Sequence, residues 1–248
     1  MALKHHWKFN GNLQDAVGDL HLTNVVGTPA YTSNKDGVAN SCLDNSVEWH
    51  AYSDNTTELS DVQRSYSFWI ENPSDVYYDS LNIYQDKMFS IKKDSSNKIV
   101  LMYRQNIYWS GSFAGLAGSL LGVTGDWFHV CLTINNDGVK KIFINGILKG
   151  VITNTIAPFD DVSLSGVVIN KFRYWAGACD KNIKNVDEIK YFDHILTDGG
   201  VTTTEQTASI DSEVWQLYIS GVNNIPPYTL NPATDITGTS ARLTWSES

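Results

Sequence analysis

The stretch GDWFHVCLTINNDGVKKIFINGILKGV, residues 125–151, decides the fold of this chain. Apolar residues alternate with other residues in three runs within it, and a period of two residues predicts β-strands. The runs are residues 127–135, 139–144 and 147–152. Residues 136–138, Asn-Asp-Gly, separate the first two runs, and Asn145-Gly146 separates the second two, as a tight hairpin turn requires. The stretch therefore predicts a three-stranded antiparallel meander, whose apolar face needs a second layer to cover it.

Composition and charge limit the classes of protein to which the chain can belong. Its 248 residues suit one large β domain or two small ones, and charged residues make up 18%, below the roughly 25% of typical soluble domains. The net charge is -9 and basic residues do not cluster, so the basic surface of a nucleic-acid-binding protein is missing. We therefore expect no nucleic-acid partner.

Neither a membrane span nor an export signal is expected. No stretch approaches 18 consecutive apolar residues, and the first 18 residues contain neither an apolar run nor a small-residue cleavage site. Cys42, Cys131 and Cys179 are widely spaced and do not form a C-x-x-C pair. Two interpretations of them stay open, a disulfide between two of them or small buried apolar side chains.

Three motifs in order resemble one family. WKFNGNLQDAVGD at residues 7–19 combines a strand at 7–9, a turn at 10–12 and a polar loop, and VDEIKYFDHILT at residues 186–197 alternates like a closing strand. Together with residues 125–151, they resemble the laminin G-like, concanavalin A-like lectin/glucanase superfamily. The resemblance implies an all-β fold, a two-sheet antiparallel β-sandwich (jelly roll) over residues 1–220.

Further alternating runs fill the sandwich, and a helix is expected near its end. The runs are residues 38–49, 65–71, 80–84, 88–92, 98–103 and 167–179. The aromatic residues of 65–71 are expected in the core. Residues 202–220 place Ile210, Val214, Leu217 and Tyr218 at helical spacing, with Thr203 or Thr204 as the residue that caps the helix.

The C-terminal part differs from the rest. Residues 221–228 contain Pro226-Pro227 and are predicted to be a linker. Residues 229–248 resemble the first strands of a fibronectin type III or Ig-like domain, which needs roughly 100 residues. Either the chain was truncated, or this tail pairs with another element or another subunit, giving a homo-oligomer.

Two groups of residues are candidates for ligand binding. Tyr108, Trp109 and Phe113 lie in a segment rich in Gly and Ser that is predicted to be a loop, and Arg173 and Trp175 lie along the predicted strand 167–179. Exposed rings of this kind stack on the apolar faces of sugars. The alternative is that the rings fold down as plugs over one end of the sandwich.

Patterns for catalysis are missing. Retaining glucanases that share this sandwich need two carboxylates at strand spacing, whereas Asp187 and Glu188 are neighbours that should point to opposite faces. No nucleophile motif, P-loop or histidine ligand pair occurs, so we expect no enzyme. Calcium is the cofactor that the loops favour, with Asp15 and Asp19 as candidate ligands, and solvated turn carboxylates are the alternative.

The resemblance implies a non-catalytic recognition or adhesion module for surface glycans. An extracellular type of fold without an export signal also fits a bacteriophage fibre or capsid-decoration protein that lies on the virion surface and contacts other virion proteins. The alternative is a bacterial cell-surface adhesin, or a carbohydrate-binding module of a larger secreted protein. Fold alone licenses only analogy, so function must be argued from a site.

Overall fold

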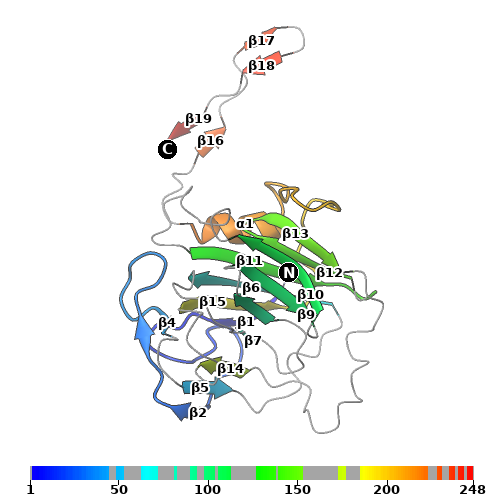
Figure 1. Ribbon diagram of the computed structural model, residues 1–248. Coiled ribbons are helices and arrows are strands. Elements are labelled where there is room, and N and C mark those ends of the chain that lie inside the picture. The colour runs from blue at the N-terminus through cyan, green and yellow to red at the C-terminus, as the bar shows by residue number, and fades with distance from the viewer. Residues whose placement is uncertain are drawn as a thin grey trace.

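A computed structural model shows a two-layer β fold with one short helix among the described residues (Figure 1). It describes residues 2–44, 49–52, 63–71, 81–82, 90–93, 98–103, 106–112, 127–137, 139–152, 173–176, 185–222, 228–230, 235–237, 240–242 and 245–247. The larger sheet has eight strands in the order β13-β12-β11-β6-β15-β4-β3, and β1 also pairs with β15. Its strands are β1 (Leu3–Trp7), β3 (Tyr31–Thr32), β4 (Cys42–Asp44), β6 (Arg64–Glu71), β11 (Trp127–Ile134), β12 (Lys140–Ile144), β13 (Ile147–Ile152) and β15 (Asn185–Phe192).

The predicted meander is confirmed. β11 pairs with β12, and β12 pairs with β13, both antiparallel. Asn145 and Gly146 form the turn between β12 and β13 with φ angles of 50° and 74°, the left-handed values that the Asn-Gly pair predicts. β6 extends the sheet on the other side of β11, from Trp127 opposite Glu71 to Ile134 opposite Arg64.

Two smaller sheets form the other layer. One has the order β10-β9-β8-β7 and the other β14-β5-β2, with β14 in contact with β7. Their strands are β2 (Asn24–Gly27), β5 (Trp49–Tyr52), β7 (Leu81–Asn82), β8 (Ser90–Lys93), β9 (Lys98–Tyr103), β10 (Asn106–Ser112) and β14 (Arg173–Ala176). β10 corrects a prediction, because residues 106–112 pair with β9 instead of forming a loop.

The middle of the eight-stranded sheet is buried on both faces. All eight side chains of β11 are buried. Trp127 and Cys131 belong to apolar clusters that include residues of α1 (Glu213–Ser220). We call the face that carries α1 the outer face. Because strand residues alternate, Phe128 and Val130 point to the opposite, inner face.

The aromatic strand 65–71 and two of the cysteines contribute to the core. Tyr66, Phe68 and Trp69 are buried, which confirms the prediction for this strand. Cys42 and Cys131 are buried free thiols, and Cys179 lies outside the described residues.

The first strand begins earlier than predicted. It covers Leu3–Trp7, whereas the sequence predicted 7–9. Phe9 has a φ of 53° and its carbonyl accepts from the N–H of Gly11 at 2.8 Å, so the turn already begins at Phe9 and excludes it from the strand.

The helix is shorter than predicted. α1 begins at Glu213 and is capped by Ser212, whose side chain accepts from the N–H of Trp215. The preceding segment pairs with the edge of β13, because Leu148 N–H donates to Gln206 and Glu205 N–H donates to Leu148. Its backbone groups are therefore already used, and Ile210 is 66% exposed instead of lying on a buried helical face.

The C-terminal strands pair only with one another among the described residues. β16 (Tyr228–Leu230) pairs with β19 (Trp245–Glu247), and β17 (Asp235–Thr237) pairs with β18 (Ser240–Arg242). Figure 1 shows these strands extending away from the sandwich. α1 ends at Ser220, and Val222 is still buried in an apolar cluster, so packing continues just into the predicted linker.

Candidate functional site

The predicted aromatic residues lie on two strands of the smaller sheets. Tyr108 and Trp109 are in β10, and Arg173 and Trp175 are in β14. Phe113 lies outside the described residues. The ladder between β10 and β9 is irregular between Ile107 and Trp109, so a bulge falls at Tyr108.

The structure does not bring the two strands together. β9, β8 and β7 lie between β10 and β14. Three hydrogen-bonded pairings and one contact between separate sheets lie between β10 and β14. The two groups of residues therefore belong to separate places on the smaller sheets.

Asp15, a predicted calcium ligand, is enclosed by hydrogen-bond donors. Its Oδ1 accepts from the N–H groups of His6, Val17 and Gly18 at 2.9–3.0 Å, and its Oδ2 lies 2.6 Å from His5 Nδ1. Burial alone would raise the pKa of Asp15, but these hydrogen bonds outweigh burial and hold it well below its usual range. The carboxylate is satisfied by the chain itself, and it ties β1 to the following loop.

Calcium at Asp15 and Asp19 stays a prediction. In the described ranges, no three His, Cys, Asp or Glu side chains come together in a way that could hold a metal ion. Calcium prefers six to eight oxygen ligands, so a site here would need further oxygens beyond these two carboxylates.

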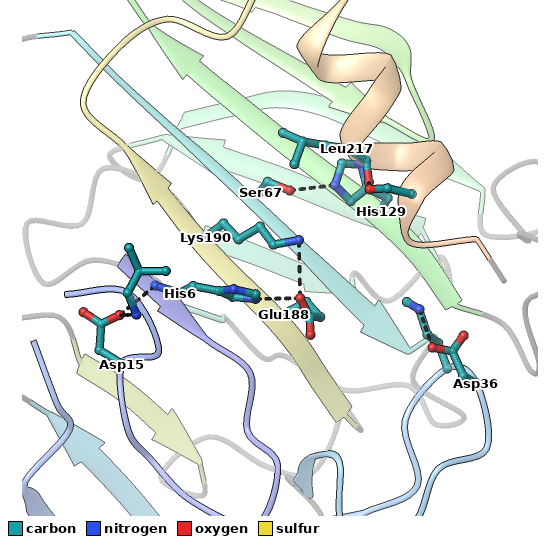
Figure 2. A network of polar contacts seen from close by, with 11 residues as sticks. His6, Asp15, Asp36, Ser67, His129, Glu188, Lys190 and Leu217 are labelled. Atoms are coloured by element: carbon teal, nitrogen blue, oxygen red, sulfur yellow. Dashed lines mark hydrogen bonds and ion pairs between the residues drawn. The ribbon is translucent and has the colours of Figure 1, made fainter. Parts of the chain in front are cut away.

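A group of charged residues lies on the outer face, and we call it the outer-face cluster; Figure 2 labels four of its members, His6, Asp36, Glu188 and Lys190. Its members are His6, Lys35, Asp36, Asp187, Glu188 and Lys190. His6 Nε2 donates to Glu188 Oε2 at 2.6 Å, and Lys190 Nζ lies 3.3 Å from the same oxygen. His6 and Lys190 are opposite one another on β1 and β15, so Glu188 joins two neighbouring strands.

A bulge in β15 creates this arrangement. Asp187 is opposite Trp69 and Lys190 is opposite Ser67, so the register shifts between them. Glu188 takes a φ of 55° and turns toward Lys190, on the same face as Asp187. The prediction that Asp187 and Glu188 point to opposite faces is therefore wrong, because it assumed an uninterrupted strand.

The pKa values of the two neighbouring carboxyl groups are shifted in opposite directions. Burial and the nearby charge of Glu188 raise the pKa of Asp187 to about 8. Burial would also raise the pKa of Glu188, but the hydrogen bond from His6 and the charge of Lys190 lower it to about 2. Near neutral pH, Glu188 is ionised while Asp187 holds its proton for much of the time.

Aromatic rings pack against the cluster. Lys35 Nζ lies 5.3 Å from the centroid of the Trp69 ring and 2.7 Å from Asp36 Oδ2. Trp69 also packs against His129 and Tyr218. Burial, together with the charges of Lys190 and Lys35, lowers the pKa of His129 to about 3, so this ring is neutral and its Nε2 bonds Ser67 Oγ at 2.8 Å.

Asp187 of the outer-face cluster is not accessible to solvent. Asp187 and Trp69 are 1% and 2% exposed, so neither reaches a ligand in this conformation. Sequence reasoning missed the cluster because strand alternation was assumed throughout β15. A signal exists, since Asp187 and Glu188 are consecutive polar residues between Val186 and Ile189, which are both buried.

The fold defines the class of protein as an antiparallel β-sandwich of the concanavalin A-like type. A family model described as the concanavalin A-like lectin/glucanases superfamily matches residues 44–202. The chain belongs to this superfamily. No curated protein matches the sequence.

Solved structures with the same fold include domains of one enzyme and two toxins. Domain 4 of AbnA, an extracellular arabinanase from Geobacillus stearothermophilus solved with arabinotriose, is 20% identical, with 87% of this chain and 98% of that domain covered and a TM-score of 0.50. The binding domain of Paraclostridial Mosquitocidal Protein 1 is 14% identical, covering 88% and 52%, with a TM-score of 0.58. The receptor binding domain of a botulinum neurotoxin C/D mosaic serotype is 15% identical, covering 99% and 61%, with a TM-score of 0.54.

These likenesses concern the fold. The matches span just over half of the length of the two toxin domains and nearly all of the arabinanase domain. The helical part of the described chain is too short and too polar for any of it to cross a membrane.

Proposed function

We propose that this chain is a non-catalytic recognition module that binds surface glycans. The observation that carries the proposal is the sandwich itself, which the chain shares with an arabinanase domain solved with arabinotriose and with two toxin binding domains. Membership of a superfamily that includes lectins supports the same function. The closed position of Asp187 also speaks against acid catalysis in this conformation.

The aromatic residues of β10 and β14 are the proposed contacts with sugar. Aromatic rings bring a large contact area with few torsions to freeze on binding. The bulge at Tyr108 supports a role for β10, because bulges redirect side chains and are frequent beside functional sites. Tyr108, Trp109 and Phe113 make up one contact, and Arg173 and Trp175 make up a second.

A glycan array on the purified chain tests the proposal, followed by titration of any glycan that binds. The Trp109→Ala and Trp175→Ala variants separate the two contacts. We expect one of them to weaken binding at least tenfold, since stacking contacts of this kind contribute about 1–3 kcal/mol.

Tyr31→Ala is the matched control for these variants. Tyr31 lies in β3, the last strand of the eight-stranded sheet, so its loss should leave glycan binding unchanged. All variants should retain the wild-type circular dichroism spectrum. Failure to bind any glycan on the array, or equal binding by all three variants, contradicts the proposed site.

The place of display is a further part of the proposal. We place the module on a bacteriophage virion, as a fibre or capsid-decoration component in contact with other virion proteins. The alternative is a bacterial surface adhesin or a carbohydrate-binding module of a secreted protein. Neighbouring genes for capsid or tail proteins would support the virion, whereas an upstream export signal and a downstream anchor would support the adhesin.

A further inference from the structure

Asp187 lies in an unusual position for a carboxyl group. It is 1% exposed on the outer face, and among the described residues its oxygens have no hydrogen-bond partner beyond a weak contact with the N–H of the adjacent Glu188. Polar groups buried in this way cost free energy unless they are paired, and an ionised carboxylate costs far more than a protonated one. The closed conformation therefore favours the protonated form of Asp187.

The loop of residues 33–41 covers this part of the outer face. Lys35 is 5% exposed and lies over the ring of Trp69, the residue opposite Asp187. Where the loop meets β4, the buried thiol of Cys42 donates to the carbonyl of Ser33 at 3.1 Å. Opening of this loop would break that hydrogen bond and expose one side of the thiol, which also belongs to an apolar cluster with Trp69, Trp127 and Tyr218.

The charged and titratable groups around Asp187 come from several elements. They are Lys35 and Asp36 of the loop, Cys42 and Asp44 of β4, Glu71 of β6, His129 of β11, Glu188 and Lys190 of β15, and Tyr218 of α1. The charges that shift the pKa of Asp187 most are those of Glu188, Lys35 and Asp36. Two of the three are acidic, so ionisation of Asp187 adds a third negative charge, while Lys35 already pairs with Asp36 and Lys190 with Glu188.

We propose that residues 33–41 form a proton-controlled latch, which is closed over the outer face while Asp187 is protonated and opens as Asp187 loses its proton. When the latch opens, water donates hydrogen bonds to the ionised carboxylate of Asp187. Opening also exposes the ring of Trp69. This regulation goes beyond glycan binding by β10 and β14 and does not depend on it.

The direction and the pH range follow from linkage. Burial raises the pKa of Asp187 to about 8 when the latch is closed, whereas a hydrated Asp has a pKa of about 4. Between these two pH values the ratio of open to closed latch increases by up to tenfold with each pH unit. Above about pH 8 the ratio stays constant, because Asp187 is ionised in both forms.

Alkylation of Cys42 measures the opening. The full chain is pulsed with N-ethylmaleimide at a series of pH values between about 5.5 and 9, and the peptide that contains Cys42 is quantified by mass spectrometry. Asp187→Asn, which resembles the protonated residue, is treated in parallel. Dividing the two rates at each pH removes the effect of pH on the thiol itself.

The expected ratio of wild type to Asp187→Asn rises by up to tenfold per pH unit and becomes level above about pH 8. Asp137→Asn is the matched control, because Asp137 is an exposed carboxylate in the turn after β11, and it should follow wild type. A ratio that does not change with pH overturns the proposal.

Lys35→Met provides a second test that does not require Asp187→Asn to fold. It keeps an apolar side chain over Trp69 but removes the cation that lowers the pKa of Asp187. Each alkylation rate is divided by the rate for the same chain unfolded in urea at that pH, which removes the effect of pH on the thiol. The pH at which this ratio becomes level should therefore move upward. An increase in the alkylation rate by the same factor at every pH would indicate mere loosening of the loop and would also overturn the proposal.

Discussion

At the scale of single residues, Asp15 shows how one carboxylate organises the first loop. Its two oxygens accept from backbone N–H groups of His6, Val17, Gly18 and Leu20, and His5 lies against Oδ2. Gly18 belongs to this arrangement because a Cβ there would lie 2.6 Å from His5 Nδ1. The sequence singled out Asp15 for calcium, whereas its contacts describe a structural anchor.

Asp15→Asn should destabilise the chain by about 3 kcal/mol, because the amide loses the charge and presents a donor to other donors. The lowered pKa of Asp15 means that its contribution is complete above about pH 4 and is lost as the pH falls further. Urea denaturation at about pH 7 and pH 3 measures both effects, and the difference between variant and wild type should shrink in acid.

Asp19→Asn is the control for this prediction, since Asp19 lies in the same loop but is not enclosed by these donors. Equal losses for the two variants would contradict the anchoring role of Asp15. Urea denaturation in calcium chloride and in EDTA tests calcium binding. Bound calcium would raise the free energy of unfolding of wild type but not of Asp15→Asn.

At the scale of elements, the turn at Asn145-Gly146 connects the meander to α1. Gly146 has a φ of 74°, and a Cβ there would lie 2.6 Å from Trp215 Cε3. Gly146→Ala therefore combines backbone strain of about 1 kcal/mol with a steric clash of about 2 kcal/mol. Thermal and urea denaturation should show a loss of about 3 kcal/mol.

Gly200→Ala separates the two contributions. Gly200 has a φ of 79°, but no atom lies within 4 Å of the position that a Cβ would take there, so only the backbone strain applies. If Gly146→Ala lowers the free energy of unfolding by no more than Gly200→Ala does, then α1 shifts to make room for the added methyl group. The docking of α1 against the turn would then contribute little.

The elements that the sequence predicts well are those whose ends carry turn chemistry. Residues 147–152 and 98–103 are strands with the predicted bounds. The helix start is different, because backbone groups of Glu205, Gln206 and Ala208 bond to Leu148 and Gly146, which are far away in the sequence. β10 likewise becomes a strand through pairing with β9, although its Gly and Ser residues favour a loop.

At the scale of the whole molecule, three short motifs predict the sandwich, while the outer-face cluster depends on pairings between distant segments. His6 and Glu188 are 182 residues apart in sequence and meet only because β1 lies beside β15. The bulge that turns Glu188 toward them interrupts the alternation from which strand faces are predicted. Fold class follows from local patterns, and the site does not.

The C-terminal strands need a source of stability outside the sandwich. β16 to β19 form two-stranded ladders apart from its sheets. Such ladders are marginally stable alone and leave edges that can pair with other strands. We expect the full chain to form a homo-oligomer through this tail and a chain that ends at Val222 to be a monomer, as measured by light scattering.

Thr229→Pro tests the same idea without shortening the chain. Thr229 is opposite Ser246 in the ladder between β16 and β19, and proline removes a backbone donor and is poorly tolerated within paired strands. The variant should lose the oligomer while its sandwich keeps the wild-type unfolding midpoint. If the full chain is a monomer, or if an oligomer survives both changes, the tail is not an assembly element. The virion proposal would then lose this support. The proposal that the sandwich binds glycans would be unaffected.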